Sequence, residues 1–335
     1  MKAPAFWFRP DASPVAQLLR PAGYVYGAIA SRLMARPGAH LAAPAITIGN
    51  FVVGGAGKTP TALAVGRMLI AQGQQPAFLS RGYGGRLSAG GATAHVADQD
   101  AREVGDEPLL LRRVAPTFVG PDRAAAAAVA IEDFGARVLV LDDGLQSRRI
   151  EPDVALAVVD GATGVGNGLC LPAGPLRAPL AAQLRHVTAV VIVGPGEAGA
   201  RVAEAAASAG RTVLKARLEP DARARAVAGR KVVAFAGIGR PEKFFATMEA
   251  MGADVVERHA FADHHFYRGE EIERLRVRAQ TQGAVLVTTE KDAVRLPPAQ
   301  HDTPRIYVIP VTLVFDDAAA AIAAIATAAR RIWPG

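Results

Sequence analysis

The segment Gly54-Gly55-Ala56-Gly57-Lys58-Thr59-Pro60 has the composition of a loop that binds phosphate groups. It follows the apolar residues 45–48, which predict a buried strand, and it opens a stretch with helical spacing, the order that a P-loop requires. Glycines let successive backbone N–H groups surround the phosphates, and the helix N-terminus adds its dipole. In such a loop Lys58 would contact the β- and γ-phosphates, and the Thr59 hydroxyl would bind Mg²⁺.

This segment departs from the usual P-loop pattern at one position. The pattern G-x-x-x-x-G-K-[ST] expects glycine where Val52 stands, and the nearest earlier glycine is Gly49. An ordinary glycine-rich turn from strand to helix is the alternative interpretation. Because Gly-Lys-Thr at a helix start after a buried strand is far more typical of a nucleotide site, we predict that ATP and Mg²⁺ are the cofactors.

Two adjacent carboxylates, Asp142 and Asp143, follow the apolar residues 138–141. An apolar strand that ends in an acid is the second element of a P-loop nucleotide site, because the acid reaches the metal. The carboxyl end of a parallel strand also lies at the sheet edge where ligands bind. The alternative is a solvated turn, for which Asp-Asp-Gly is suited. The apolar run favours a metal site formed by Thr59, Asp142 and Asp143.

Three more groups of residues have types that can do chemistry. Asp106 stands at the start of a predicted helix, where it could equally be a capping residue. His264 and His265 follow Asp263, and a histidine held by a carboxylate can act as a general base near neutral pH. Arg177 ends a proline-rich loop and suits bidentate contact with a phosphate or carboxylate. From residue types alone, each group is as consistent with a structural role as with a functional one.

The elements that position these residues alternate between strand and helix. The strands predicted in the first set are residues 45–48, 76–79, 136–141, 154–159, 188–193 and 212–216, and the helices are 58–71, 107–114, 122–134 and 196–208. The second set comprises strands 232–236, 254–257, 285–288 and 305–309, and helices 241–251, 269–280 and 316–331. Continuous apolar strands with helices between them predict parallel sheets covered on both faces. We therefore expect a P-loop NTPase-like α/β fold with two α/β/α domains, mostly parallel sheets and a short linker.

The predicted boundaries divide the chain into four parts. Residues 1–36 form an amphipathic N-terminal segment, and residues 37–218 form the P-loop domain. Residues 219–230 are polar and rich in arginine, which indicates a linker, and residues 231–335 form a smaller α/β domain whose last helix could pack on the first. A ligand cleft between the two domains follows from this arrangement.

Composition restricts the partners of the chain. The net charge is +7 and the pI is about 9.9, which favours an anionic membrane or a phosphorylated substrate, although an arginine-rich composition alone also raises the pI. No basic run alternates with aromatic residues, so we expect no nucleic acid partner. The single cysteine, Cys170, excludes an internal disulfide, and no Cys/His cluster has the spacing of a zinc site. No apolar stretch is long enough to span a bilayer.

Residues 1–36 combine aromatic, basic and apolar side chains. Five apolar residues recur at helical spacing: Ala22, Val25, Tyr26, Ile29 and Leu33. Pro21 suits the start of this helix, and Phe6, Trp7 and Phe8 precede it. Such a segment can lie in a membrane interface or pack on the domain core, and periodicity alone slightly favours the core.

In chain order, these motifs resemble the tetraacyldisaccharide 4'-kinase family of lipid A biosynthesis. Seven segments stand in the family's order: residues 49–60, 80–84, 104–108, 142–146, 171–177, 263–265 and 288–292. The resemblance implies ATP-dependent phosphorylation of the 4'-hydroxyl of a tetraacylated glucosamine disaccharide 1-phosphate, which gives lipid IVA. It also implies a kinase domain joined to a second α/β/α domain by a short β linker.

The resemblance also implies a place in the cell. The enzyme would lie on the cytoplasmic face of the inner membrane of a Gram-negative bacterium, in peripheral contact with its anionic surface. Because the substrate is embedded in lipid, the membrane-interface interpretation of residues 1–36 becomes the better one. We expect no obligate protein partner.

The resemblance assigns roles residue by residue. The nucleotide and metal positions match Lys58, Thr59, Asp142 and Asp143. Asp106 matches the catalytic aspartate and His264 its histidine partner from the second domain, with His265 as a rival; Arg177 matches an arginine expected at anionic groups. Two positions depart from the family, because Ser147 stands where members often have histidine and Ala178 where they often have glutamate.

Overall fold

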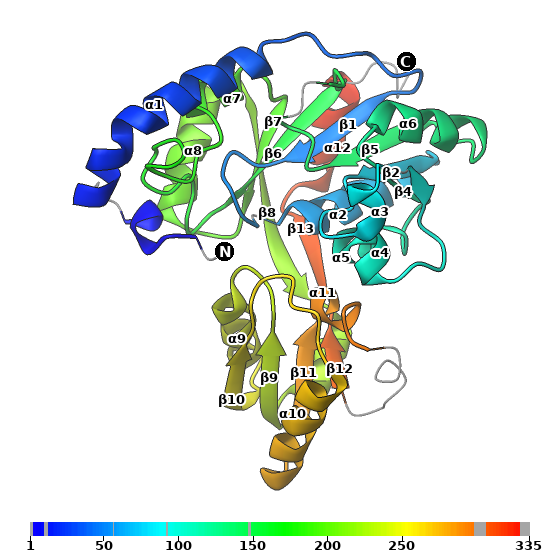
Figure 1. Cartoon of the computed structure of the whole chain (residues 1–335), viewed down its shortest axis with the longest axis vertical. Coiled ribbons are helices and arrows are strands. Elements are labelled where there is room, and N and C mark those ends of the chain that lie inside the picture. The colour runs from blue at the N-terminus through cyan, green and yellow to red at the C-terminus, as the bar shows by residue number, and fades with distance from the viewer. Residues whose placement is uncertain are drawn as a thin grey trace.

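The computed structural model describes residues 3–9, 13–55, 57–91, 93–146, 149–297 and 306–328. Two lobes are visible in Figure 1, an upper one built on a large sheet and a lower one built on a small sheet. Ala56 of the predicted P-loop and Ser147 lie outside the described residues. The two sheets of the lobes confirm the predicted α/β fold.

The large sheet has the strand order β13-β8-β7-β6-β1-β5-β2-β4-β3 within the described residues. Its strands are β1 (Ala45–Gly49), β2 (Pro76–Ser80), β3 (Ala94–His95), β4 (Thr117–Val119), β5 (Val138–Asp142), β6 (Val154–Asp160), β7 (Ala189–Val193), β8 (Thr212–Pro220) and β13 (Val311–Phe315). Neighbours pair in parallel, except that β3 with β4 and β13 with β8 are antiparallel. The six strands predicted here are present, whereas β3, β4 and β13 were missed.

Helices cover both faces of the large sheet, because successive strand residues point to opposite sides. Ile46 of β1 lies in one apolar cluster with α2 (Lys58–Ala71) and α12 (Ala318–Ala328). Its neighbour Ala45 lies in another cluster, with α6 (Arg123–Glu132). The other helices of this lobe are α3 (Arg86–Ala89), α4 (Ala101–Val104), α5 (Asp106–Leu111), α7 (Leu180–Leu184) and α8 (Glu197–Ser208). Burial on both faces explains why the strands are continuous apolar runs.

The lower lobe is built on a parallel sheet with the order β10-β9-β11-β12. Its elements are β9 (Lys231–Ala236), α9 (Pro241–Ala250), β10 (Asp254–Ala260), α10 (Gly269–Thr281), β11 (Val285–Thr289), α11 (Glu290–Ala293) and β12 (Ile306–Ile309). Phe245 of α9 packs with Ala234 on one face, and Leu275 of α10 packs with Phe235 on the other. The second α/β/α unit expected from the sequence is therefore present.

Two connections join the lobes. β8 pairs with β13, and Figure 1 shows this antiparallel pair running from the upper lobe down to the lower one. The predicted limits need correction at both connections. β8 extends to Pro220, and the 3-10 helix η2 (Ala222–Val227) places Val227 in the core of the lower lobe, so residues 219–230 are not simply a linker. After β12 the chain returns to the upper lobe with β13 and α12, so residues 231–335 do not form one domain.

Helix α1 (Pro14–Met34) lies on the outer side of the upper lobe (Figure 1). Ser13 caps it, since the Ser13 hydroxyl oxygen accepts a backbone hydrogen bond from the first turn. The prediction that Pro21 starts the helix is wrong, because Pro21 lies in its interior. Glycine lets the helix approach the protein closely: a Cβ on Gly23 would lie 2.9 Å from the carbonyl oxygen of Cys170.

The apolar stripe predicted on this helix faces solvent rather than the core. All five stripe residues are exposed, including Val25 at 62% and Ile29 at 53%, and Leu18 beside them is 81% exposed. Trp7 of the preceding 3-10 helix η1 (Ala5–Phe8) is the part that faces inward, where its indole N–H donates to the carbonyl oxygen of Pro172 at 3.1 Å. Packing of the stripe on the domain core is therefore wrong. Among the described helices, none has both the length and the apolarity to cross a bilayer.

Candidate active site

The P-loop joins β1 to α2 at the carboxyl edge of the large sheet. Gly57 has a φ of 91° and precedes the first turn of α2, and Gly54 has a φ of 109°, conformations that glycine adopts without strain. The side-chain amide of Asn50 donates a hydrogen bond of 2.8 Å to the carbonyl oxygen of Gly54, which fixes the loop from within. The first N–H groups of α2 are therefore available for a phosphate.

Val52, the departure from the P-loop pattern, has a structural reason. It forms an antiparallel bridge with Leu176. Two backbone N–H···O bonds flank this bridge, from Val53 to Pro175 at 2.9 Å and from Arg177 to Phe51 at 3.0 Å. Because this position is paired like a strand residue, a β-branched side chain suits it and glycine is not required.

Thr59, Asp142 and Asp143 lie together because β1 and β5 are neighbours in the sheet, with Ile48 in register with Asp142. The Thr59 hydroxyl donates to Oδ2 of Asp142 at 3.5 Å. Among the described residues, Oδ1 of this buried carboxylate has no hydrogen-bond partner. Mg²⁺ prefers oxygen ligands and is typically held by one or two carboxylates together with substrate phosphates, so this donor set fits Mg²⁺.

The pKa values of the two acids, Asp142 and Asp143, are shifted in opposite directions. Burial raises the pKa of Asp142 to about 7, and the charge of Glu107 adds to the shift, so a cation beside Asp142 would favour its ionised form. Burial also acts to raise the pKa of Asp143, but Lys58 and Arg177 outweigh it and hold that pKa below its usual value. The Nζ atom of Lys58 lies 3.9 Å, and Nη1 of Arg177 3.4 Å, from the same Asp143 oxygen.

Arg177 connects the P-loop to the acid pair. Besides its contact with Asp143, its Nε donates to the carbonyl oxygen of Val52 at 3.1 Å, and its Nη1 donates to Oε1 of Gln146 at 3.1 Å. The hydrogen bonds of Arg177 therefore go to Val52, Asp143 and Gln146 in this structure. The predicted contact of Arg177 with an anionic ligand stays a prediction.

Asp106 is buried at the first turn of α5, and its Oδ2 lies 3.0 Å from Nδ1 of His264 in the lower lobe. His264 has a φ of 58°, a rare conformation for a residue with a side chain. The ring of His265 points elsewhere, with its Nε2 3.1 Å from Oε2 of Glu271. The structure therefore brings His264, and not His265, to Asp106.

Two cations of the lower lobe that the sequence analysis missed also approach Asp106. Nζ of Lys291 lies 3.9 Å, and Nε of Arg295 3.5 Å, from its Oδ2. Burial acts to raise the pKa of Asp106, but the hydrogen bond to His264 and these two cations hold it below its usual value. Lys291 stands in the motif 288–292, to which no role was given, whereas no sequence signal pointed to Arg295.

Arg295 is held in place by a buried carboxylate. Oδ1 of Asp292 accepts hydrogen bonds from Nη2 of Arg295 at 2.8 Å, from the Tyr267 hydroxyl at 2.7 Å and from the Gly237 N–H at 2.7 Å. Glu107, next to Asp106, pairs in turn with Lys291 at 3.0 Å. The core of the lower lobe therefore fixes Arg295, whereas Glu107 of the upper lobe fixes Lys291.

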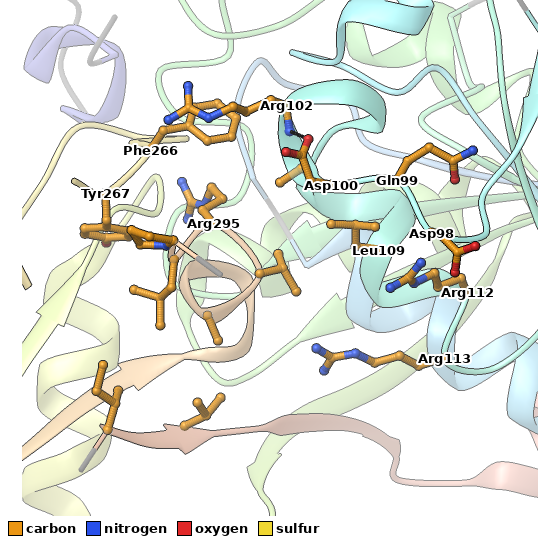
Figure 2. Close-up of a pocket in the computed structure, with 17 residues that line it drawn as sticks. Asp98, Gln99, Asp100, Arg102, Leu109, Arg112, Arg113, Phe266, Tyr267 and Arg295 are labelled. Carbon is orange, nitrogen blue, oxygen red and sulfur yellow. Dashed lines mark hydrogen bonds between the residues drawn. The ribbon is translucent and has the colours of Figure 1, made fainter. Parts of the chain in front are cut away.

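A cavity of about 600 Å³ lies between the lobes beside this site (Figure 2). The guanidinium of Arg102 lies over the ring of Phe266, 4.7 Å from its centroid, and Arg112 and Arg113 face the same space. Arg295 reaches the cavity, but the described residues that line it include none of the four side chains predicted to be catalytic. The predicted site lies outside this cavity.

A phosphate loop, the adjacent acids Asp142 and Asp143, and a carboxylate–histidine pair thus lie near one edge of a mostly parallel sheet. This combination of fold and site defines a P-loop phosphotransferase. The family model of tetraacyldisaccharide-1-P 4'-kinase matches residues 15–330. The chain therefore belongs to the tetraacyldisaccharide 4'-kinase family, and it is a kinase.

Two relatives agree with this assignment, and a solved structure agrees with the fold. The tetraacyldisaccharide 4'-kinase of Methylorubrum populi is 51% identical over 319 residues, which cover 95% of this chain and 96% of the relative. That of Bradyrhizobium sp. is 48% identical over 321 residues, covering 95% and 92%. The crystal structure of "apo" form LpxK from Aquifex aeolicus in complex with ATP is 23% identical, with a TM-score of 0.73, and covers 94% of this chain and 99% of that chain. The predicted fold and family resemblance are confirmed.

Proposed function

We propose that this kinase transfers the γ-phosphoryl group of ATP to the 4'-hydroxyl of a tetraacylated glucosamine disaccharide 1-phosphate, forming lipid IVA in lipid A biosynthesis. The observation that carries the proposal is the environment of Asp106. It is a buried carboxylate with a lowered pKa, paired with His264, near the edge that holds the P-loop. A P-loop ATPase or GTPase that acts as a switch has no acceptor hydroxyl that would need such a base.

In this mechanism Asp106 accepts a hydrogen bond from the 4'-hydroxyl and takes its proton as the bond between the 4'-oxygen and the γ-phosphorus forms. The bond between the γ-phosphorus and the β–γ bridging oxygen breaks, and ADP leaves with that oxygen. Nδ1 of His264 holds Oδ2 of the Asp106 carboxylate, and Lys58 contacts the transferred phosphate. Phosphoryl transfer depends mainly on positioning and electrostatic stabilisation, so an ionised base of low pKa suffices to orient the hydroxyl. Thr59, Asp142 and Asp143 would hold Mg²⁺, which neutralises phosphate charge when bound.

The two lobes divide this work. Asp106 and Lys58 belong to the upper lobe, whereas His264 and Lys291 come from the lower one. Closure of the lobes around the substrates would therefore complete the site and exclude water, which limits hydrolysis of ATP.

The direct test is transfer of labelled phosphate from ATP to an acylated disaccharide 1-phosphate in detergent. We expect label at the 4'-position of the lipid and little release of inorganic phosphate. ATP hydrolysis at the same rate with and without lipid, and no labelled lipid, would favour the switch instead.

We propose further that α1 lies in the membrane interface on the cytoplasmic face of the inner membrane. Leu18, Val25 and Ile29 are exposed on the side of α1 away from the protein, where they cover no core. Arg20 and Arg32 on the same helix suit an anionic lipid surface. Since the acceptor is itself a lipid, binding at this surface would bring the enzyme to its substrate.

Replacing Leu18, Val25 and Ile29 together with aspartate should abolish most binding to vesicles that contain anionic lipid. Each apolar side chain that is lost from the interface should weaken binding by about tenfold or more, because its burial contributes about 1.5–3 kcal/mol. Sedimentation with vesicles measures the effect. Val277→Asp is the matched control, because Val277 is 52% exposed on α10 in the lower lobe. Equal sedimentation of the triple variant and the control would contradict the proposal.

A further inference from the structure

Arg295 is a fully buried arginine of the lower lobe that reaches the boundary with the upper lobe. It follows α11, and its Nε lies 3.5 Å from Oδ2 of Asp106. Burial of a guanidinium is costly unless charges and hydrogen bonds compensate it, so the partners of Arg295 indicate its role. They connect it to both members of the Asp106–His264 pair.

The first connection runs to His264 through the carbonyl oxygen of Gly237, which follows β9. This oxygen accepts hydrogen bonds from Nη1 of Arg295 at 2.9 Å and from the backbone N–H of His264 at 3.0 Å. His264 has a left-handed φ of 58°, a conformation that persists only where surrounding contacts maintain it. Arg295 therefore fixes the carbonyl group that holds the His264 backbone.

Gly237 is itself fixed from two sides. Its N–H donates to Oδ1 of Asp292 at 2.7 Å, the same oxygen that accepts Nη2 of Arg295. A Cβ at this position would lie 2.9 Å from the carbonyl oxygen of Ala262, so the Gly237 backbone packs directly against the segment that leads to His264. Asp292 and Arg295 thus hold Gly237 at its N–H and at its carbonyl group.

The second connection runs to Asp106. Nε of Arg295 donates to the carbonyl oxygen of Lys291 at 2.9 Å, which keeps the guanidinium close to the end of α11 and beside Asp106. Oδ2 of Asp106 then meets three groups of the lower lobe, at 3.0 Å from His264, 3.5 Å from Arg295 and 3.9 Å from Lys291. Oδ1 instead accepts the backbone N–H of Glu107 at 2.9 Å. The lower lobe therefore holds this carboxylate by Oδ2.

We propose that Arg295 is a positioning residue that aligns Asp106 with His264 for phosphoryl transfer. It acts on Asp106 through its charge and on His264 through Gly237, so that the imidazole and the carboxylate keep their contact. Because the three groups of the lower lobe meet Oδ2, the acceptor hydroxyl would approach Oδ1. This inference rests on the proposed function, because it takes Asp106 to act on the acceptor.

Replacing Arg295 with methionine should lower kcat by about tenfold or more, with the KM for ATP nearly unchanged. The variant should fold, since Asp292 still accepts hydrogen bonds from Tyr267, Gly237 and Thr289. Arg276→Met is the matched control, because Arg276 is a buried arginine on α10 that pairs with Glu273 of the same helix. The control should keep the wild-type kcat.

A double-mutant cycle with Asp106→Asn separates positioning from a merely structural role. If Arg295 acts through Asp106, Arg295→Met should lower kcat by less than about threefold once Asp106 is already replaced. A structural role would lower kcat by the same factor in both backgrounds, and this outcome would overturn the inference. A wild-type kcat in Arg295→Met would overturn it as well, whereas a wild-type kcat in Asp106→Asn would refute the proposed base.

The pH dependence of kcat gives an independent measurement. Arg295 is one of the cations that hold the pKa of Asp106 below its usual value, so its loss should raise that pKa. The rate requires the ionised carboxylate, so its fall at acid pH should begin at a higher pH in Arg295→Met than in the wild type. The other charged or titratable groups around this site are Glu107, Asp263, His264, Lys291 and Asp292.

Arg295→Lys tests the charge and the geometry separately, and it applies even if the methionine variant does not fold. Lysine keeps the positive charge, so the acid side of the pH profile should stay near the wild type. Its single ammonium cannot replace the planar fork that joins Gly237, Asp292 and Lys291, so kcat should still fall by about tenfold. Wild-type kcat in Arg295→Lys would show that the hydrogen bonds to Gly237 do not position His264.

Discussion

Replacing Asp106 with asparagine should lower kcat by about 10²- to 10⁴-fold, while the KM for ATP stays close to the wild-type value. Asparagine keeps the size of the side chain and an oxygen that can face His264, but it cannot accept the proton of the acceptor hydroxyl. The P-loop and the acid pair do not depend on Asp106 for their hydrogen bonds. The loss should therefore fall on the chemical step rather than on nucleotide binding.

The variant should also fold, since Arg295 keeps its hydrogen bond of 2.8 Å to Asp292 when Asp106 loses its charge. Asp133→Asn is the matched control, because Asp133 is an exposed aspartate at the end of α6. Steady-state kinetics with ATP and the lipid acceptor measure the effect. A kcat within about threefold of the wild type would show that Asp106 is not the base.

Most helices and strands of this fold could be predicted, because the pattern that indicates each one involves only residues that are close together in the sequence. The glycine-rich turn before Lys58 predicted α2 with its observed limits, 58–71. The apolar run before Asp142 predicted β5 and the place of Asp142 at its carboxyl end. Such signals reflect the backbone conformation and burial of a few consecutive residues, and residue type and spacing indicate both.

Features that depend on partners distant in the chain were missed. β13 is five residues long and gains its place by pairing with β8, about ninety positions earlier, across the whole lower lobe. Arg295 stands one helical turn beyond the motif 288–292, and only the tertiary fold brings it to Asp106. Likewise, a stripe of apolar residues on α1 has the same spacing whether it faces the core or solvent, so periodicity could not choose between them.

Replacing Lys58 with methionine should lower kcat by about 10²- to 10³-fold, the loss typical when one preorganised group that stabilises transition-state charge is removed. The Lys58 side chain is only 12% exposed, and Nζ lies 3.4 Å from the carbonyl oxygen of Gly54 and 3.9 Å from Asp143. Its ammonium is therefore already held in the loop before a nucleotide binds. Methionine has a similar length but no charge, so the loop should keep its shape while the phosphates lose a cation.

The KM for ATP should rise together with the fall in kcat, because Lys58 would contact the phosphates in the ground state as well as in the transition state. This combined change distinguishes Lys58 from Asp106, whose loss should affect kcat alone. Lys58→Arg should restore the activity only in part, since a planar guanidinium does not replace a compact ammonium within a narrow loop. Lys231→Met, an exposed lysine at the start of β9, serves as the control. If Lys58→Met kept both constants near the wild-type values, the phosphates would not lie at this loop, and the site would have to be sought elsewhere along the sheet edge.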